Sequence, residues 1–186
     1  MVTNQTFDQN GNLAETQTVN GATYTTYQFD GAERLTQITK YAFNGVFVAR
    51  SSFIYDGFGR RKEDIEQTFS GSTNTNGAWT TTSDVLFVYD GMNVIEELDS
   101  RYTSRPLLAY NVWAGTQGGL LSRATFQYFN GTLLPADNAT SYYSYDGRGN
   151  VTQLTNSAGS IGVSLFWCVG EFPYLCKRPS DSYNGP

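Results

Sequence analysis

The sequence predicts an all-β fold, an antiparallel β-hairpin array, on three observations. Residues that favour strands, above all Thr, Val, Ile, Tyr and Phe, are abundant. No long window has the three-to-four periodicity of an amphipathic helix. A motif of an aromatic residue, an aspartate and a nearby glycine, followed by an apolar residue, recurs along the chain and indicates stacked units. Its five copies begin at Phe7-Asp8, Phe29-Asp30, Tyr55-Asp56, Tyr89-Asp90 and Tyr145-Asp146.

Each copy of the motif has the residues of a tight turn at the end of a strand. An aromatic residue ends runs such as 52–55 and 85–89. The carboxylate that follows can accept a bond from an N–H two residues on, and glycine supplies a positive φ. We therefore expect hairpin corners, with no catalytic role, formed by Phe7, Asp8, Gly11, Phe29, Asp30, Tyr55, Asp56, Gly59, Tyr89, Asp90, Asn93, Tyr145, Asp146 and Gly149.

Two copies depart from the glycine of the motif. Asn93 stands at the glycine position of the fourth copy, and asparagine tolerates the left-handed region better than most residues. Glu33 stands there in the second copy and predicts a different turn.

The interval between motif copies grows along the chain, which favours hairpins that lengthen at the end away from the motif. The polar stretch 70–77 is expected to be such a far-end loop. The run 94–98 is better interpreted as a strand than as a helix.

Charge and hydropathy exclude several kinds of partner. The net charge is −5, and the cationic run Arg60-Arg61-Lys62 is followed at once by Glu63-Asp64, so no basic patch for nucleic acid is expected. No apolar run approaches the roughly 20 residues of a membrane span. The first residues also lack the pattern of a signal peptide.

The side-chain inventory argues against catalysis, metals and cofactors. The chain contains no His, which removes Ser–His and Cys–His nucleophile pairs and the commonest metal ligand. Cys168 and Cys176 lack zinc-site spacing; they form a disulfide if the chain is exported or stay as thiols if it is not. Paired carboxylates for glycoside cleavage are an alternative role for the motif aspartates, but the turn role is favoured. The aromatic residues, Trp79 and Trp113 among them, could also stack on sugars, but most are expected to fill the packed face of the sheet.

The motif series resembles the YD-repeat (RHS-repeat) family of large bacterial secreted polypeptides and toxin-complex shells, with relatives in the animal teneurins. Two later stretches strengthen the resemblance. The run 106–113, followed by Gly118-Gly119-Leu120-Leu121, is similar to an aromatic and Gly-Gly-Leu-Leu passage of bacterial members, and 142–152 is close to a late repeat. The resemblance implies a β-sheet that spirals into a hollow shell around a cargo. The aspartate-bearing C-terminal core, which closes the shell and releases the cargo in several members, has no counterpart after Gly159.

We therefore expect a YD-repeat β-hairpin region at 1–160 and a divergent tail at 161–186. The expected function is a non-enzymatic structural segment of a shell or surface protein, with an extracellular location suggested by the resemblance. Its partners would be the remainder of a larger YD-repeat protein or a second copy of the chain, because open sheet edges pair with other strands. The alternative is an extracellular β module that binds carbohydrate or protein.

Overall fold

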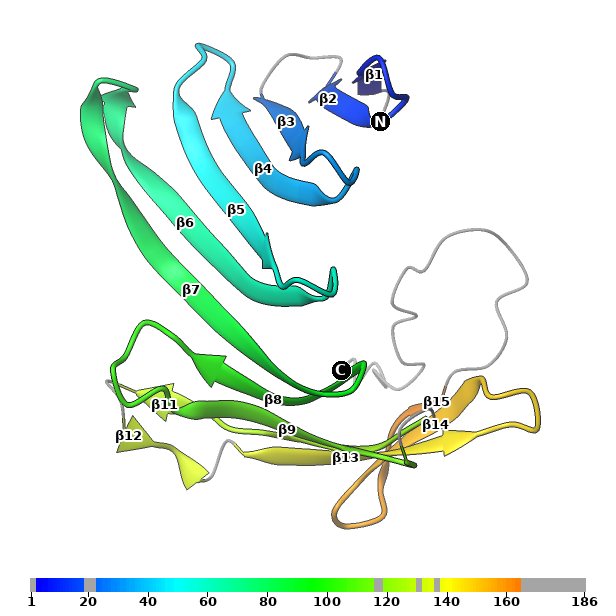
Figure 1. The fold of residues 1–186 in the computed structure, drawn as a ribbon. Coiled ribbons are helices and arrows are strands. Elements are labelled where there is room, and N and C mark those ends of the chain that lie inside the picture. Colours follow the sequence, from blue (N-terminus) through cyan, green and yellow to red (C-terminus); the bar gives the residue numbers. More distant parts are fainter. Residues whose placement is uncertain (1–2, 19–22, 116–118, 130–131, 136–137, 165–186) are drawn as a thin grey trace, which may run out of the picture. The chain divides into compact units, whose positions relative to one another are not determined.

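A computed structural model describes residues 3–18, 23–115, 119–129, 132–135 and 138–164. All regular elements in these ranges are strands, apart from a single 3₁₀ position, so the all-β prediction is confirmed (Figure 1). Thirteen strands form one open sheet in chain order, β1-β2-β3-β4-β5-β6-β7-β8-β9-β10-β13-β14-β15, and β11 pairs with β12 separately.

The chain divides into two compact units, at 1–89 with 96–107 and at 90–95 with 108–186. The strands of the first unit are β1 (Thr3–Phe7), β2 (Leu13–Thr18), β3 (Thr23–Phe29), β4 (Leu35–Ala42), β5 (Phe47–Tyr55), β6 (Arg61–Thr73) and β7 (Asn76–Asp90, whose last residue belongs to the second unit). β8 (Asn93–Asp99) contributes residues to both units. The second unit contains β9 (Leu107–Trp113, from residue 108), β10 (Leu120–Thr125), β11 (Tyr128–Phe129), β12 (Thr132–Leu133), β13 (Ala139–Tyr145), β14 (Val151–Asn156) and β15 (Ile161–Ser164).

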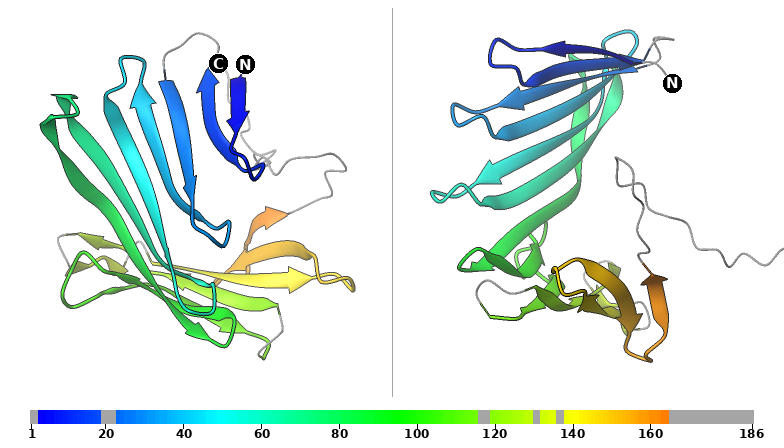
Figure 2. Two further views of the ribbon diagram at one scale, coloured as in Figure 1. Left: turned by 45° about the horizontal axis from the view of Figure 1, so that its top comes forward. Right: turned by 90° about the vertical axis from the view of Figure 1, so that its right-hand side faces the viewer.

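Strands of the first unit lie side by side in one layer, as both views of Figure 2 show. Few side chains of the described residues are therefore buried. Ala109 is the buried apolar residue, and the buried polar ones are Thr39, Asp99 and Asn111. Because a single layer has no packed interior between two sheets, its cohesion depends on backbone ladders and on contacts between side chains of neighbouring strands.

A row of aromatic rings supplies many of those contacts at the end of the first unit opposite the motif corners. Tyr24 and Tyr41 stack with ring centroids 4.5 Å apart. Phe47 continues the row from Tyr41 and contacts both Phe69 and Trp79, and these two also contact each other. The rings come from strands β3 to β7, so this row joins five strands. Trp79 is thus packed among its neighbours rather than presented to a ligand.

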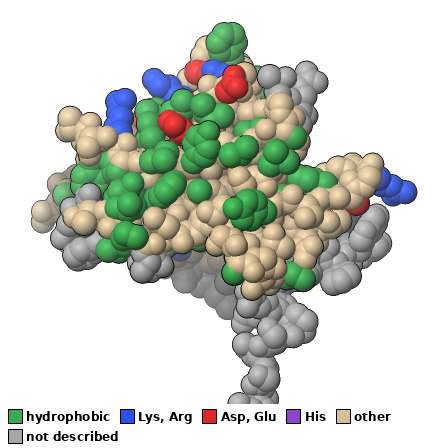
Figure 3. Space-filling model, turned by 90° about the horizontal axis from the view of Figure 1, so that it is seen from below, with side chains coloured by type: hydrophobic (Ala, Val, Ile, Leu, Met, Phe, Trp, Pro, Cys, Tyr) green, Lys and Arg blue, Asp and Glu red, His purple; other side chains and the backbone are tan. Residues whose placement is uncertain are grey.

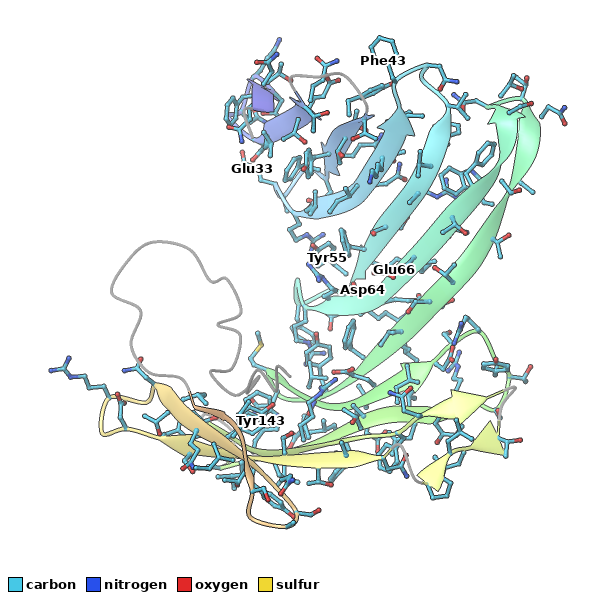
Figure 4. All side chains as sticks on the ribbon, turned by 180° about the vertical axis from the view of Figure 1, so that it is seen from behind. Glu33, Phe43, Tyr55, Asp64, Glu66 and Tyr143 are labelled. Atoms are coloured by element: carbon cyan, nitrogen blue, oxygen red, sulfur yellow. The ribbon has the colours of Figure 1, made fainter. Side chains whose placement is uncertain are left out.

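The turns at this far end differ in detail from the sequence expectation. β6 and β7 continue through most of the polar stretch 70–77, leaving Asn74 and Thr75 between them, so the expected loop is a tight turn on a long hairpin. The Asn74 side chain accepts a bond from the amide of Phe47 and donates one to the carbonyl of Gly45, at 2.8 and 2.9 Å. Neighbouring far ends are therefore linked. Glu33 and Phe43 lie beyond the two opposite ends of β4 (Figure 4).

The expected tail, 161–186, begins as a strand of the sheet. β15 pairs with β14, with Leu154 opposite Val163. Cys168 and Cys176 lie outside the described residues.

Candidate functional site

The motif aspartates form hairpin corners with one shared hydrogen-bond frame, defined here by residues 56–60. The amide of Asp56 donates to the carbonyl of Arg60, and the amide of Gly59 donates to the carbonyl of Asp56, at 2.9 and 3.0 Å. The Asp56 carboxylate oxygen Oδ1 accepts bonds from the amides of Phe58 and Arg60, at 2.9 and 3.0 Å. One side chain thus satisfies two amides that the turn leaves unpaired.

The same frame recurs at three other motif copies. Its backbone bonds and its two Oδ1 bonds are repeated at 8–12, 30–34 and 146–150. In each, the motif aromatic pairs with the residue just after the corner and the ladder register shifts there, as in Tyr55 opposite Arg61. The glycines Gly11, Gly59 and Gly149 have φ of 88°, 80° and 84°. A Cβ is disfavoured in this conformation, which explains the glycine of the motif.

The residue four positions after each aspartate completes the corner. Arg34 and Arg60 contact the second carboxylate oxygen of Asp30 and Asp56 through both Nε and Nη2, at 2.7–2.8 Å. In the other two corners Asn12 and Asn150 donate a side-chain amide instead. The side chain that binds the carboxylate is therefore charged in two of these corners and neutral in the other two.

Hydrogen bonds lower the pKa of all four corner carboxyls. The chief causes are the Asn12 amide for Asp8, the Arg34 side chain for Asp30 and the Asn150 side chain for Asp146. Burial raises the pKa of Asp56, but bonds from Arg60 and Phe58 outweigh this effect and the net shift is downward. Carboxyls held as ionised acceptors suit a turn, whereas a general acid needs a raised pKa.

Tyrosines of the motif connect consecutive corners. The hydroxyl of Tyr55 donates to the carbonyl of Leu35, and that of Tyr89 donates to the carbonyl of Arg61, at 2.8 and 2.6 Å. Each acceptor is the residue immediately after the preceding corner. The guanidinium of Arg34 also lies 4.7 Å from the centre of the Tyr55 ring, and that of Arg60 lies 4.4 Å from the Tyr89 ring. The aromatic residue of one corner thus holds the corner before it.

Tyr145 makes the equivalent bond in the second unit. Its hydroxyl donates to the carbonyl of Leu120 at 2.7 Å. A Cβ on Gly119 would lie 2.7 Å from the Tyr145 ring, so glycine is required for this approach. Gly119 and Leu120 of the Gly-Gly-Leu-Leu passage therefore form the contact with Tyr145, the last motif tyrosine.

The expectation of a different turn at Glu33 was wrong. Glu33 adopts a φ of 60° and its amide donates to the carbonyl of Asp30, as the glycine does in the other corners. The Asp30 carboxylate, held by two amides and by Arg34, fixes the turn and imposes this unfavourable backbone conformation on a glutamate.

The expectation for Asn93 was also wrong, because Asn93 is not among the residues with positive φ. The fourth copy turns in two residues, Gly91 and Met92, between β7 and β8, and Gly91 has φ of 58°. A positive φ at the first central residue alone is typical of a type II′ turn. Glycine next to Asp90, two residues before the expected position, thus makes this hairpin. Asn93 instead donates its side-chain amide to the carbonyl of Gly115.

A further corner lies at 156–160, where the sequence analysis expected none. The Asn156 side-chain oxygen accepts bonds from the amides of Ala158 and Ser160, at 3.0 and 2.9 Å, and Gly159 has φ of 75°. Asparagine replaces aspartate and no aromatic residue precedes it. The spacing Asx-x-x-Gly, searched without the aromatic residue, would have found this corner.

The described residues contain no cluster of three or more His, Cys, Asp or Glu side chains suited to a metal ion. No helix in the described ranges is long and apolar enough to cross a membrane. In the second unit a shallow hollow of about 220 Å³ is lined by Asp90, Asn93, Ile95, Tyr110, Asn111, Val112, Trp113 and Gly115. The Trp113 indole N–H donates to the carbonyl of Val94 at 2.8 Å, which fixes the ring at this hollow.

No protein-family model matches the sequence, and no curated protein matches it. Solved structures to which the chain is similar include a crystal structure of TcdB2-TccC3, at 19% identity over 84% of this chain and 9% of that chain, with a TM-score of 0.33. A structure of the Tc holotoxin pore of Photorhabdus luminescens gives the same values. A protein of unknown function from Bacteroides fragilis matches at 17% identity over 74% of this chain and 94% of that chain, with a TM-score of 0.30. The chain thus spans 9% of the length of each of these two toxin chains.

Proposed function

We propose that this chain is a non-enzymatic structural segment of a YD-repeat shell or surface protein, located outside the cell, that encloses or scaffolds a cargo. The observation that carries the proposal is the tyrosine bond between consecutive corners. Tyr55 and Tyr89 each bind the carbonyl that follows the preceding corner, so the motif specifies how one hairpin is attached to the next. A motif whose residues attach one hairpin to the next favours a structural role over a catalytic one.

The two outermost strands of the described sheet, β1 and β15, are where a partner strand is expected to pair. Among the strands of the described residues, β1 pairs with β2 alone and β15 with β14 alone, so each leaves backbone groups on one side without a described strand. The side chains of Asn4, Gln5 and Thr6 in β1 are exposed and uncharged, without the lysines that commonly guard a free edge. The remainder of a larger YD-repeat protein, or a second copy of this chain, would fill such an edge.

Sedimentation of the purified chain over a hundredfold concentration range tests this proposal. The wild-type chain is expected to self-associate, and Gln5→Lys is expected to weaken that association by placing a charge on the β1 edge. Thr75→Lys, in the exposed β6–β7 turn, is the matched control and should associate like the wild type. A chain that stays monomeric throughout and unfolds in one sharp calorimetric transition would contradict the proposal.

The hollow in the second unit favours a second candidate function, binding of carbohydrate. Tyr110 is 43% exposed and lines the hollow together with the carboxylate-bearing Asp90. Aromatic faces with adjacent polar groups are typical of sugar subsites. A glycan array would test this candidate, with Tyr110→Ala expected to lose any signal and Tyr102→Ala, in the first unit, expected to retain it. An array without hits would remove the candidate.

A further inference from the structure

The side chain of Asp84, in β7 of the first unit, is half-buried. It lies opposite Ile65 of β6, so Glu63, two residues along β6, is on the same face of the sheet. Diagonal neighbours on one face of an antiparallel pair are within reach of each other, and a hydrogen bond between the two carboxyl groups, which requires a proton on one of them, is among the causes that raise the pKa of Asp84. The Asp84 oxygen Oδ1 is buried and has no hydrogen-bond partner in the described structure.

A third element, the segment 99–101 at the end of β8, docks on β7 beside this pair. The amide of Ser100 donates to the carbonyl of Asp84 at 2.8 Å. Arg101 donates to the carbonyl of Thr82 at 2.6 Å. The same guanidinium binds both carboxylate oxygens of Asp99, which is 2% exposed. The segment is thus held to β7 through two backbone carbonyls, one of them that of Asp84 itself.

Charge balance around Asp84 is unfavourable to its ionised form. Glu63 from β6 and Asp99 from β8 are acidic, and the cation that opposes their effect, Arg101, is already engaged by Asp99. Burial, then the bond with Glu63, then the charges of Glu63 and Asp99 raise the pKa of Asp84 to about 6, against the opposing effect of Arg101. Figure 3 shows a face of the molecule on which hydrophobic side chains are many and charged ones are few.

We propose that Asp84 holds a proton against Glu63 in mildly acidic solution, and that release of this proton to solvent near neutrality loosens the docking of 99–101 on β7. The reason is that ionised Asp84 leaves its buried Oδ1 without a donor beside two other carboxylates. Water reaches this atom when the segment moves away. The segment 99–101, named the clasp below, therefore binds β7 more tightly in acid than at neutral pH.

The direction of the effect follows from proton linkage. The folded chain binds the Asp84 proton more tightly than the unfolded chain, whose carboxyl has the ordinary value of 3.8. Stability that depends on this proton is fully present below pH 4 and is lost as the pH rises through about 6. The folding equilibrium constant is expected to fall by up to about a hundredfold over this window, and by less where partial exposure of Asp84 screens the charges.

Two measurements on the full chain test the clasp between pH 4.5 and 7.5. Urea unfolding of the wild type should show the loss of stability with rising pH, and Asp84→Asn should flatten that profile. Glu63→Gln should move the loss to lower pH, because its amide can donate to ionised Asp84. Glu15→Gln, in β2, is the matched control and should keep the wild-type profile.

Hydrogen exchange is the second measurement. A purely structural role of Asp84 would not make amide protection depend on pH. The protection factor of the Ser100 amide should fall between pH 5 and 7 in the wild type and stay constant in Asp84→Asn. A constant wild-type protection factor would overturn the proposal, as would an Asp84→Asn profile as steep as that of the wild type. Should Asp84→Asn fail to fold, carboxyl carbon resonances of the wild type decide the matter. An Asp84 midpoint near 4 would then refute the clasp.

Discussion

The hydroxyl of Tyr55 donates to the backbone carbonyl of Leu35 at 2.8 Å, across one whole hairpin of sequence. Leu35 is the first residue after the preceding corner, and Tyr89 repeats the relationship with Arg61. The tyrosine of the motif is thus a connector between hairpins, while its aspartate shapes the turn within one hairpin. The two residues lie side by side in the sequence but act on different corners.

Removing the Tyr55 hydroxyl should weaken the first unit by about 1 kcal/mol, because Tyr55→Phe keeps the ring and loses one hydrogen bond to backbone. Urea unfolding measures this cost. Tyr24→Phe is the control, since the Tyr24 hydroxyl has no partner among the described residues and its ring stacks on Tyr41. Equal stability of Tyr55→Phe and the wild type would show that the connection contributes nothing.

Substitution of Asp56 should separate the turn role from the ion pair. Asp56→Ala loses both backbone bonds and the contact with Arg60, whereas Asp56→Asn keeps an oxygen for the two amides, as Asn156 does in its own corner. Thermal unfolding should rank the wild type above Asp56→Asn and Asp56→Asn above Asp56→Ala.

Asp90→Ala is the matched control for this series, because the Gly91-Met92 turn does not have the carboxylate-capped corner frame. It should lower the unfolding temperature less than Asp56→Ala. The reverse order would contradict the assignment of the corner bonds to stability.

Replacing Glu33 with glycine should stabilise the chain by up to about 1 kcal/mol. The substitution relieves the cost of a left-handed glutamate, which exceeds the entropy that glycine adds to the unfolded chain. Gly59→Ala, at the equivalent position with φ of 80°, should do the opposite. Chemical unfolding of the two variants checks the pair, and a destabilised Glu33→Gly would mean that the glutamate side chain has a stabilising role of its own.

A methyl group at Gly119 should disturb the last motif tyrosine. Gly119→Ala places its Cβ 2.7 Å from the Tyr145 ring and should cost about 1–3 kcal/mol as the ring moves away from Leu120. Gly147→Ala is the control, because no atom lies within 4 Å of its added Cβ. A change in near-ultraviolet circular dichroism in the first variant alone would identify the displaced ring.

Acid should destabilise the four corners. Because hydrogen bonds lower the pKa of Asp8, Asp30, Asp56 and Asp146 in the folded chain, their stabilisation is present above the ordinary value of 3.8 and is lost as the pH falls through their lower values. The free energy of unfolding, measured between pH 2 and 4, should therefore decline steeply as the pH falls. Asp30→Asn with Asp56→Asn should make this decline shallower, and an unchanged slope would exclude these carboxyls as its source.

Local chemistry let the sequence predict the strands and three of the corners, at 8–12, 56–60 and 146–150. Asp and Gly three residues apart determine a turn through bonds within five residues, so no distant contact is needed to recognise it. The same reasoning failed at Glu33, where the bonds of Asp30 override the preference of one residue, and at Asn93, where Gly91 makes an earlier turn.

By itself, the sequence determined that this chain is a series of antiparallel hairpins with aspartate corners, because propensity and turn bonding act over a few residues. Tertiary structure alone decided what those corners touch. It placed Tyr55 on Leu35, joined the far-end aromatic rings into one row, and brought Glu63, Asp84 and Asp99 together from three elements. Such contacts depend on the register of strands that are distant in sequence, and no local pattern records that register.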